Sequence, residues 1–279
     1  MTIRVVTDST CDLPAGLAQA NDITVLPTYV HVGQESYLDG VDLTRGEFYA
    51  RLPQIQGPVT TAAPAVGVFK EAYEQLAREG AGEILSIHLA TDLSGLLNVA
   101  RLGAEAAQGV EVTLFDSRQI SMGLGFLALF AARAAQDGAG MDDLVAALRD
   151  AVPRTHVFAV LDTLEYLRRS GRVSWPEFGL GTLLRIKPMV YVHEGHVQSL
   201  EKVRTQRRAL ERLLQHVEAL GSLRELALLH TANPQGAEQL RQEASHLIPK
   251  AYEPVCVEVT PTIGVHVGPG ALGFACVAD

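Results

Sequence analysis

The segment Ile3-Arg4-Val5-Val6-Thr7-Asp8-Ser9-Thr10-Cys11-Asp12 decides the fold class of this chain. Its first half is a run of apolar and β-branched residues, which is typical of a buried strand. Its second half is small and polar, which predicts that the strand, over residues 3–7, ends in a turn. The elements beyond this turn decide how the strand is paired.

The same pattern, a strand followed by a helix, repeats through the first half of the chain. Further strands are predicted at residues 23–32, 83–89 and 110–115. Helices are predicted at residues 64–79, 94–107 and 124–136. Another helix begins at Thr44, because the Thr44 hydroxyl and the Glu47 carboxylate have the spacing of a capping box. Strands that alternate with helices in this way predict a parallel sheet covered by helices.

The second half of the chain has a different pattern. A break at residues 136–140 and a short helix at residues 141–151 separate the two halves. Beyond them, strands at residues 186–192 and 196–200 flank a turn, which predicts a hairpin. The sequence therefore predicts a two-domain α/β protein. Residues 1–152 form a parallel sheet flanked by helices, and residues 153–279 form an α+β domain with a mixed or antiparallel sheet.

Composition and charge exclude several classes of protein. The formal net charge is −9, so the chain lacks the basic surface that nucleic-acid binding usually requires. Its longest apolar run, residues 124–132, is much shorter than the ~20 residues that span a bilayer. The N-terminal segment has no apolar signal region, and we expect a cytoplasmic protein. The cysteines are widely spaced and predict neither a disulfide nor a metal site, and we expect no cofactor.

Polar turns come after three of the predicted strands and point to a binding site. They are residues 7–12, 90–95 and 116–117, and Thr60-Thr61 adds a fourth polar segment before a helix. Each turn by itself has the composition of an ordinary helix cap. Because the carboxyl ends of parallel strands meet at one edge of a sheet, the turns together predict an anion site built from hydroxyls and free N–H groups.

The segment Thr262-Ile263-Gly264-Val265-His266-Val267-Gly268-Pro269-Gly270-Ala271-Leu272-Gly273 places one histidine among four glycines and a proline. Glycine allows backbone conformations that other residues avoid and lets another group approach closely. We interpret the segment as a glycine-rich loop that holds His266 against a small group. An ordinary turn with an incidental histidine is the alternative.

A hydrolase or phosphotransferase acting on acyl esters or acyl phosphates is the competing function. Ser94 would be its nucleophile, His266 its base and Asp8 the residue that orients the base. The Leu93-Ser94-Gly95 segment lacks the preceding Gly-x of a nucleophile elbow, which argues against this interpretation. His193 and His196 flank a turn without nearby acidic or thiol partners, so they predict no metal site.

Several motifs, taken in order, resemble those of the DegV family of bacterial fatty-acid-binding proteins. The resemblance runs from about residue 3 to residue 277. The motifs are Thr7-Asp8-Ser9-Thr10-Cys11-Asp12-Leu13-Pro14, Thr60-Thr61-Ala62-Ala63-Pro64, Leu93-Ser94-Gly95, Asp116-Ser117, Thr163-Leu164-Glu165-Tyr166-Leu167-Arg168-Arg169-Ser170-Gly171-Arg172-Val173-Ser174, Lys187-Pro188, Lys202-x-Arg204-Thr205 and His266-x-Gly268-Pro269-Gly270.

This resemblance implies a non-catalytic carrier that holds one long-chain fatty acid, such as palmitate, in a tunnel between two domains. It also implies a separate kinase that phosphorylates the carboxylate of the bound lipid. By motif, Thr61, Ser94 and His266 would bind that carboxylate, with Thr60 and Gly95 as supporting contacts.

The resemblance further implies that Arg172 meets the kinase, and exposed arginines are favoured at interfaces. Two positions depart from the family pattern. Leu96 comes after the Ser-Gly pair where a polar residue is usual, and Ala62-Ala63-Pro64-Ala65 replaces a more polar segment. These departures imply a less polar head-group site, in which Thr61 and Ser94 carry more of the binding.

Overall fold

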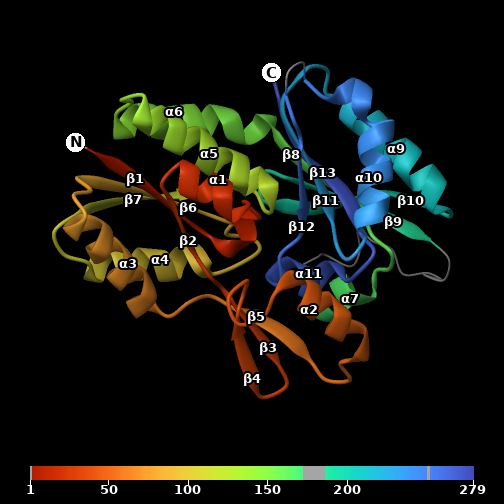
Figure 1. The fold of residues 1–279 in the computed structure, drawn as a ribbon, viewed down its shortest axis with the longest axis horizontal. Coiled ribbons are helices and arrows are strands. Elements are labelled where there is room, and N and C mark those ends of the chain that lie inside the picture. Colours follow the sequence, from red (N-terminus) through yellow and green to blue (C-terminus); the bar gives the residue numbers. More distant parts are fainter. Residues whose placement is uncertain (1, 172–185, 250–251) are drawn as a thin grey trace.

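A computed structural model describes residues 2–171, 186–249 and 252–279. They form a four-stranded sheet, a six-stranded sheet and a smaller three-stranded sheet, with helices packed against them (Figure 1). The α/β fold class predicted from the sequence is confirmed. In the described ranges no helix has both the length and the apolar composition that crossing a membrane requires.

The four-stranded sheet is parallel throughout, with the strand order β2-β1-β6-β7. Its strands are β1 (Ile3–Asp8), β2 (Ile23–Leu26), β6 (Glu83–His88) and β7 (Glu111–Asp116). Helices α3 (Val66–Arg78) and α4 (Leu96–Ala106) lie on one side, and α1 (Ala15–Ala20), α5 (Met122–Gln136) and α6 (Met141–Ala151) lie on the other (Figure 1). Because both faces are covered, the successive residues Val5 and Val6 are both buried.

The six-stranded sheet is mixed, with the order β10-β9-β8-β13-β11-β12. Its strands are β8 (Thr155–Val160), β9 (Lys187–His193), β10 (His196–Val203), β11 (Leu223–His230), β12 (Val255–Glu258) and β13 (Leu272–Ala278). Only the β11–β12 pair is parallel among these neighbours. Helices α9 (Gln206–Glu218) and α10 (Pro234–Glu243) cover one face (Figure 1).

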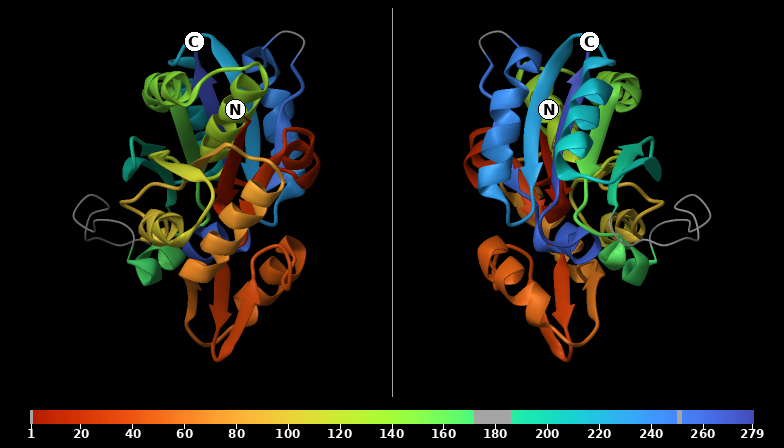
Figure 2. Two further views of the ribbon diagram at one scale, coloured as in Figure 1. Left: turned by 90° about the vertical axis from the view of Figure 1, so that its left-hand side faces the viewer. Right: turned by 90° about the vertical axis from the view of Figure 1, so that its right-hand side faces the viewer.

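The three-stranded sheet corrects one prediction. The single strand expected over residues 23–32 is two strands, because Pro27 lacks the N–H that a strand needs to continue its ladder. The first part, β2, joins the parallel sheet. The second part, β3 (Tyr29–Val32), lies between β4 (Glu35–Leu38) and β5 (Val59–Ala62) in an antiparallel sheet. This small sheet and α2 (Arg45–Arg51) project together from one end of the molecule (Figure 2).

The expected glycine-rich loop around His266 is also corrected. Its first half is a helix, α11 (Pro261–Val267), which begins at a proline in a position where the missing N–H costs nothing. Gly268 ends the helix with φ = 73°. A Cβ atom there would come within 2.1 Å of the Tyr166 ring, so glycine is required for the close approach of α7 (Glu165–Ser170). The histidine is therefore held by a helix rather than by a loop.

Helix α5 lies between the two large sheets. It contacts β1 and β6 on one side and β8 and β13 on the other. Ten of its 15 residues are buried, which explains why it is apolar nearly all round. One continuous hydrophobic core includes Val5, Leu127 and Ala275 and so joins residues from both halves of the chain. The domain boundary near residue 152 stays a prediction.

Short 3-10 helices complete the described elements. They are Ser9–Cys11, Leu52–Gln54, Val152–Arg154 and Ser245–Leu247. The capping box predicted for Thr44 and Glu47 is confirmed at the start of α2.

Candidate functional site

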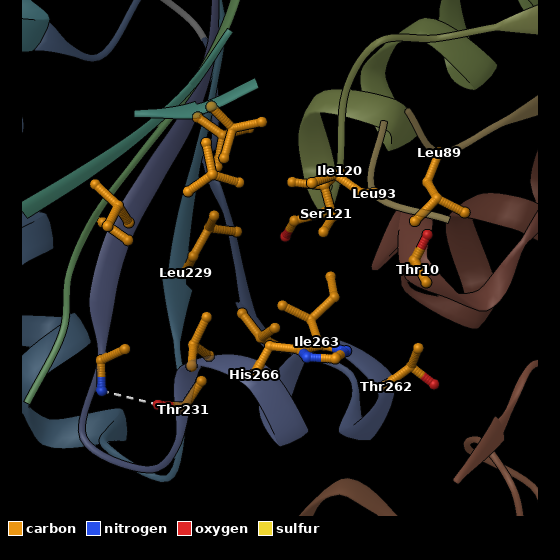
Figure 3. A pocket seen from close by; sticks show the side chains of 18 of the residues that line it. Thr10, Leu89, Leu93, Ile120, Ser121, Leu229, Thr231, Thr262, Ile263 and His266 are labelled. Carbon is orange, nitrogen blue, oxygen red and sulfur yellow. Dashed lines mark hydrogen bonds between the residues drawn. The ribbon is translucent and has the colours of Figure 1, made fainter. Parts of the chain in front are cut away.

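A large cavity lies where the loops of the parallel sheet face the six-stranded sheet (Figure 3). Its volume is about 160 Å³. That is room for on the order of ten waters, far more than the small voids that close packing normally leaves. A cavity of this kind is a candidate ligand-binding site.

The walls of the cavity are mostly apolar. Leu89, Leu93 and Ile120 enter from the loops of the parallel sheet, and Figure 3 shows them across the cavity from Leu229 on β11. The remaining six-stranded wall includes valine, alanine and leucine side chains, namely Val157, Ala159, Val190, Val192 and Leu272. Such walls suit a long apolar group better than a sugar or a nucleotide.

Three polar residues predicted from the sequence line this cavity together. Thr61 comes from β5, Ser94 from the loop before α4, and His266 from the last turn of α11. The Thr61 Oγ1 atom lies 3.5 Å from His266 Nε2. We call Thr61, Ser94 and His266 the polar clamp. Three separate elements therefore bring hydrogen-bonding side chains to one mostly apolar cavity.

The environment of Ser94 differs in detail from the predicted helix cap. The structure places Gly95 at the N-cap of α4, and the Ser94 Oγ atom accepts a hydrogen bond from the Leu96 N–H at 3.2 Å. The hydroxyl proton of Ser94 is thus directed elsewhere, because this bond uses only a lone pair. The position beside the positive end of α4 suits an anion.

The other predicted site residues lie elsewhere. Thr60 is exposed and, as a neighbour of Thr61 in β5, points to the opposite face of the small sheet. Gly95 does not line the cavity. Neither Asp116 nor Ser117 lines it either, and Asp116 instead accepts a hydrogen bond from Thr91 at the surface. Arg172 lies outside the described residues.

Asp8 does not orient His266, as the hydrolase interpretation required. Its Oδ2 atom lies 2.9 Å from Nδ1 of His88, and His88 Nε2 lies 2.8 Å from the Ser86 hydroxyl. These three side chains have the contacts of a catalytic triad, but all are fully buried and none lines the cavity. Substrate has no access to them, so the arrangement is structural. The sequence signal for it is the alternation in β6, which puts residues 86 and 88 on one face.

A second buried polar network is centred on Asp12, and the sequence does not predict it. The Asp12 carboxylate accepts hydrogen bonds from the Ser121 hydroxyl at 2.6 Å and from the Thr260 N–H at 2.7 Å. Burial raises the pKa of Asp12 from 3.8 to about 6, although Arg45, 3.4 Å away, opposes the shift. Asp12 thereby ties the start of α5 to the start of α11, and both of these elements border the cavity.

Several basic residues of the second half form local ion pairs. Arg207 and Arg208 pair with Glu211 on the exposed face of α9. Arg212 and His216 both contact Glu201 on β10. Hydrogen bonds from Arg212 are the main reason that the pKa of Glu201 falls to about 2. These contacts join α9 to the edge strand and lie apart from the cavity.

Comparison with known proteins places the fold and the cavity in a family. Residues 2–279 match the family model described as "Uncharacterised protein, DegV family". The chain belongs to the DegV family. A DegV domain-containing protein of Streptomyces coelicolor is 36% identical over 273 residues, which are 97% of this chain and 96% of that protein. The family predicted from the motifs is therefore confirmed.

Solved DegV structures share the whole fold. A DegV family protein from Thermus thermophilus, described for its fatty acid binding, has a TM-score of 0.91 at 31% identity, with 100% of both chains covered. DegV from Bacillus subtilis, described as a fatty acid binding protein, has a TM-score of 0.89 at 27% identity, again with 100% of both chains covered. The arrangement of the three sheets is therefore that of the DegV fold.

Proposed function

We propose that this chain binds one long-chain fatty acid, with the alkyl chain in the cavity and the carboxylate at the polar clamp. The observation that carries the proposal is the cavity itself, whose walls are mostly apolar and into which Thr61, Ser94 and His266 bring hydrogen-bonding groups. The fatty acid binding described for the DegV proteins of Thermus thermophilus and Bacillus subtilis supports it.

The energetics of such a ligand match the two parts of the cavity. A buried carboxylate is unfavourable unless charge-assisted hydrogen bonds stabilise it, and Thr61, Ser94 and His266 are suited to donate them. An alkyl chain of about sixteen carbons gains on the order of 10 kcal/mol at ~0.8 kcal/mol per methylene, before ordering costs. The alkyl chain supplies most of the affinity. The clamp adds to it and determines which end of the ligand lies beside α4.

In this proposal the chain is a carrier and not itself a catalyst. It presents the carboxylate of the bound lipid to a separate kinase, which forms the acyl phosphate. The docking role of Arg172 and the cytoplasmic location expected from the sequence are parts of the same proposal. The engagement of Asp8 with His88 argues against the competing hydrolase, since Asp8 is then not the residue that orients His266.

Substitutions in the clamp test the binding site. We expect Thr61→Val, Ser94→Ala and His266→Gln each to weaken palmitate binding roughly 10- to 100-fold, which corresponds to a charge-assisted hydrogen bond of about 1.5–3 kcal/mol. Equilibrium binding of radiolabelled palmitate to delipidated protein measures the dissociation constants, and native mass spectrometry measures retained lipid.

Thr60→Val is the matched control for Thr61→Val, because it makes the same change on the other face of β5. We expect it to leave palmitate affinity unchanged. Equal affinities for the Thr61, Ser94 and His266 variants and the wild-type protein would refute the clamp. Failure of the wild-type protein to take up palmitate would refute the function.

A further inference from the structure

Asp39 does not line the cavity and is only 3% exposed. Its carboxylate is held by hydroxyl groups. It accepts hydrogen bonds from the hydroxyls of Ser9 at 2.9 Å, Thr28 at 3.3 Å and Thr260 at 2.6 Å. Within the described part of the chain it forms no ion pair at 4 Å or less. Hydroxyl donors from three separate segments therefore stabilise this buried charge, and a carboxylate holds such donors strongly.

One of these donors belongs to the segment that positions Thr61. Thr28 stands two residues before Val30, and Val30 pairs with Thr61 across the β3–β5 ladder. The backbone N–H of Asp39 also donates to the Thr28 carbonyl at 2.9 Å. Asp39 therefore fixes the entry into β3 through both its backbone and its side chain, and the ladder register carries that position to Thr61.

A second donor, Thr260, belongs to the helix that positions His266. Thr260 is the N-cap of α11, and the Thr262 hydroxyl lies 2.6 Å from the Thr28 hydroxyl. His266 comes four residues after Thr262, so both side chains lie on one face of the helix, and both line the cavity. Asp39 thus joins the N-terminal end of α11 to the small sheet, nearly two turns of helix before the histidine.

We propose that Asp39 is a positioning residue for the polar clamp. It sets the separation between Thr61 and His266. This inference rests on the proposed function. Hydrogen bonds weaken steeply as donor and acceptor move apart, so a loosened α11 lowers affinity for a carboxylate without removing any clamp group. Asp12 still accepts the Thr260 N–H in the absence of the Asp39 charge, and it keeps α11 attached.

Asp39→Asn tests the proposal, because asparagine keeps the shape and removes the charge. We expect palmitate binding by the delipidated protein to weaken about tenfold, with the far-ultraviolet circular dichroism unchanged. Asp42→Asn is the matched control, because Asp42 is exposed on the turn after β4, where it accepts the Leu38 N–H at 2.9 Å. Its variant is expected to bind within twofold of the wild-type protein.

A double-mutant cycle with His266→Gln separates positioning from general damage to the fold. If Asp39 acts through His266, Asp39→Asn weakens binding about tenfold in the wild-type background and less than threefold in the His266→Gln background. Equal factors in the two backgrounds, or no effect in either, overturn the proposal. Such a result leaves fatty acid binding standing, whereas a wild-type protein that binds no palmitate overturns both.

Ser9→Ala provides a second route to the same test if Asp39→Asn does not fold. Ser9 donates to Asp39 and accepts the Thr28 N–H at 3.2 Å, but it does not line the cavity. We expect a smaller loss of affinity, two- to fivefold, which again shrinks in the His266→Gln background. A loss of the same size in both backgrounds contradicts the role of Asp39.

Discussion

Asp12, a residue near the cavity, is buried in a way that disfavours its ionised form. Its carboxylate is fully buried between the first turn of the parallel sheet and α11. Burial is the main reason that its pKa is raised to about 6, and Arg45, Ser121 and Thr260 only partly oppose the effect. The folded protein therefore binds a proton at Asp12 more tightly than the unfolded chain does.

This gives a pH dependence of stability with a definite sign. Between about pH 4 and pH 6 the folded state holds more protons at Asp12, so this group's contribution to the free energy of unfolding falls as the pH rises. A shift of about two units corresponds to roughly 3 kcal/mol. We expect the stability of Asp12→Asn, relative to the wild-type protein, to increase by up to that amount from pH 4 to pH 7.5.

Urea denaturation of both proteins at several pH values measures this difference. Asparagine also loses an acceptor, which lowers the stability of the variant by the same amount at every pH. The pH-dependent part is therefore separate from the loss of the hydrogen bond. A constant difference between the two proteins from pH 4 to pH 7.5 would contradict the buried titration.

At the residue scale, the sequence predicts what stands in motifs and misses what depends on contacts across the fold. Thr61, Ser94 and His266 lie together at the cavity, as their motifs suggest. Asp39 stands in no predicted motif, because its partners Thr28 and Thr260 are 11 and 221 residues away along the chain. The competing hydrolase interpretation paired Asp8 with His266, whereas the packed sheet brings His88 beside Asp8.

At the scale of single elements, α11 is where local sequence and tertiary structure disagree most. Glycine disfavours a helix by about 1 kcal/mol relative to alanine, which is why the segment predicts a loop. In the structure the segment is nevertheless helical, and Gly264 packs against α2. A Cβ atom at Gly264 would lie 2.5 Å from the Tyr49 hydroxyl and 2.8 Å from the Phe48 ring. Glycine here is a packing requirement rather than a signal for a turn.

Gly264→Ala is therefore expected to destabilise the protein by about 1–3 kcal/mol through overpacking, despite the better helix propensity of alanine. The variant should also bind palmitate more weakly, because a displaced α11 moves His266. Thermal unfolding and palmitate binding measure the two effects. Gly67→Ala is the control, because Gly67 lies in α3 with nothing within 4 Å of a Cβ. That variant should be neutral or slightly stabilised, and equal behaviour of the two would contradict the packing argument.

For most elements, hydrophobic periodicity predicts the type correctly and the ends less well. Helix α6 matches its predicted range, and the hairpin of β9 and β10 is present, because local signals suffice for both. The small sheet is different. Its strands are four residues long, and β4 is largely exposed, so neither periodicity nor composition distinguishes them from loops.

At the scale of the whole molecule, α5 joins the two large sheets into one core. Because α5 is buried on both sides, separation of the two sheets would expose one of its apolar faces to water. The helix therefore stabilises the two sheets as one unit. The parallel half and the mixed half are therefore expected to unfold together, even though their sequence patterns differ.

Calorimetry tests this expectation. We expect a single transition whose calorimetric and van't Hoff enthalpies agree. Palmitate at about 100 times its dissociation constant should stabilise the folded state by about 2.7 kcal/mol and raise the midpoint of that one transition. Two resolved transitions, of which palmitate shifts only one, would instead support independent domains divided near residue 152.

The small sheet has a consequence for how ligand preference can change. Its segment contributes Thr61 to the clamp and Thr28, Ala62 and Ala63 to the rest of the lining, but none of the valine and leucine side chains that line the cavity. The chain enters the small sheet after Pro27 and leaves it before Pro64. The sheet and α2 therefore come from one continuous segment of about forty residues. If the proposed function holds, exchange of this segment between relatives would combine the carboxylate-binding threonine of one protein with the apolar cavity walls of another. The preferences for head group and for acyl chain can in this way diverge separately.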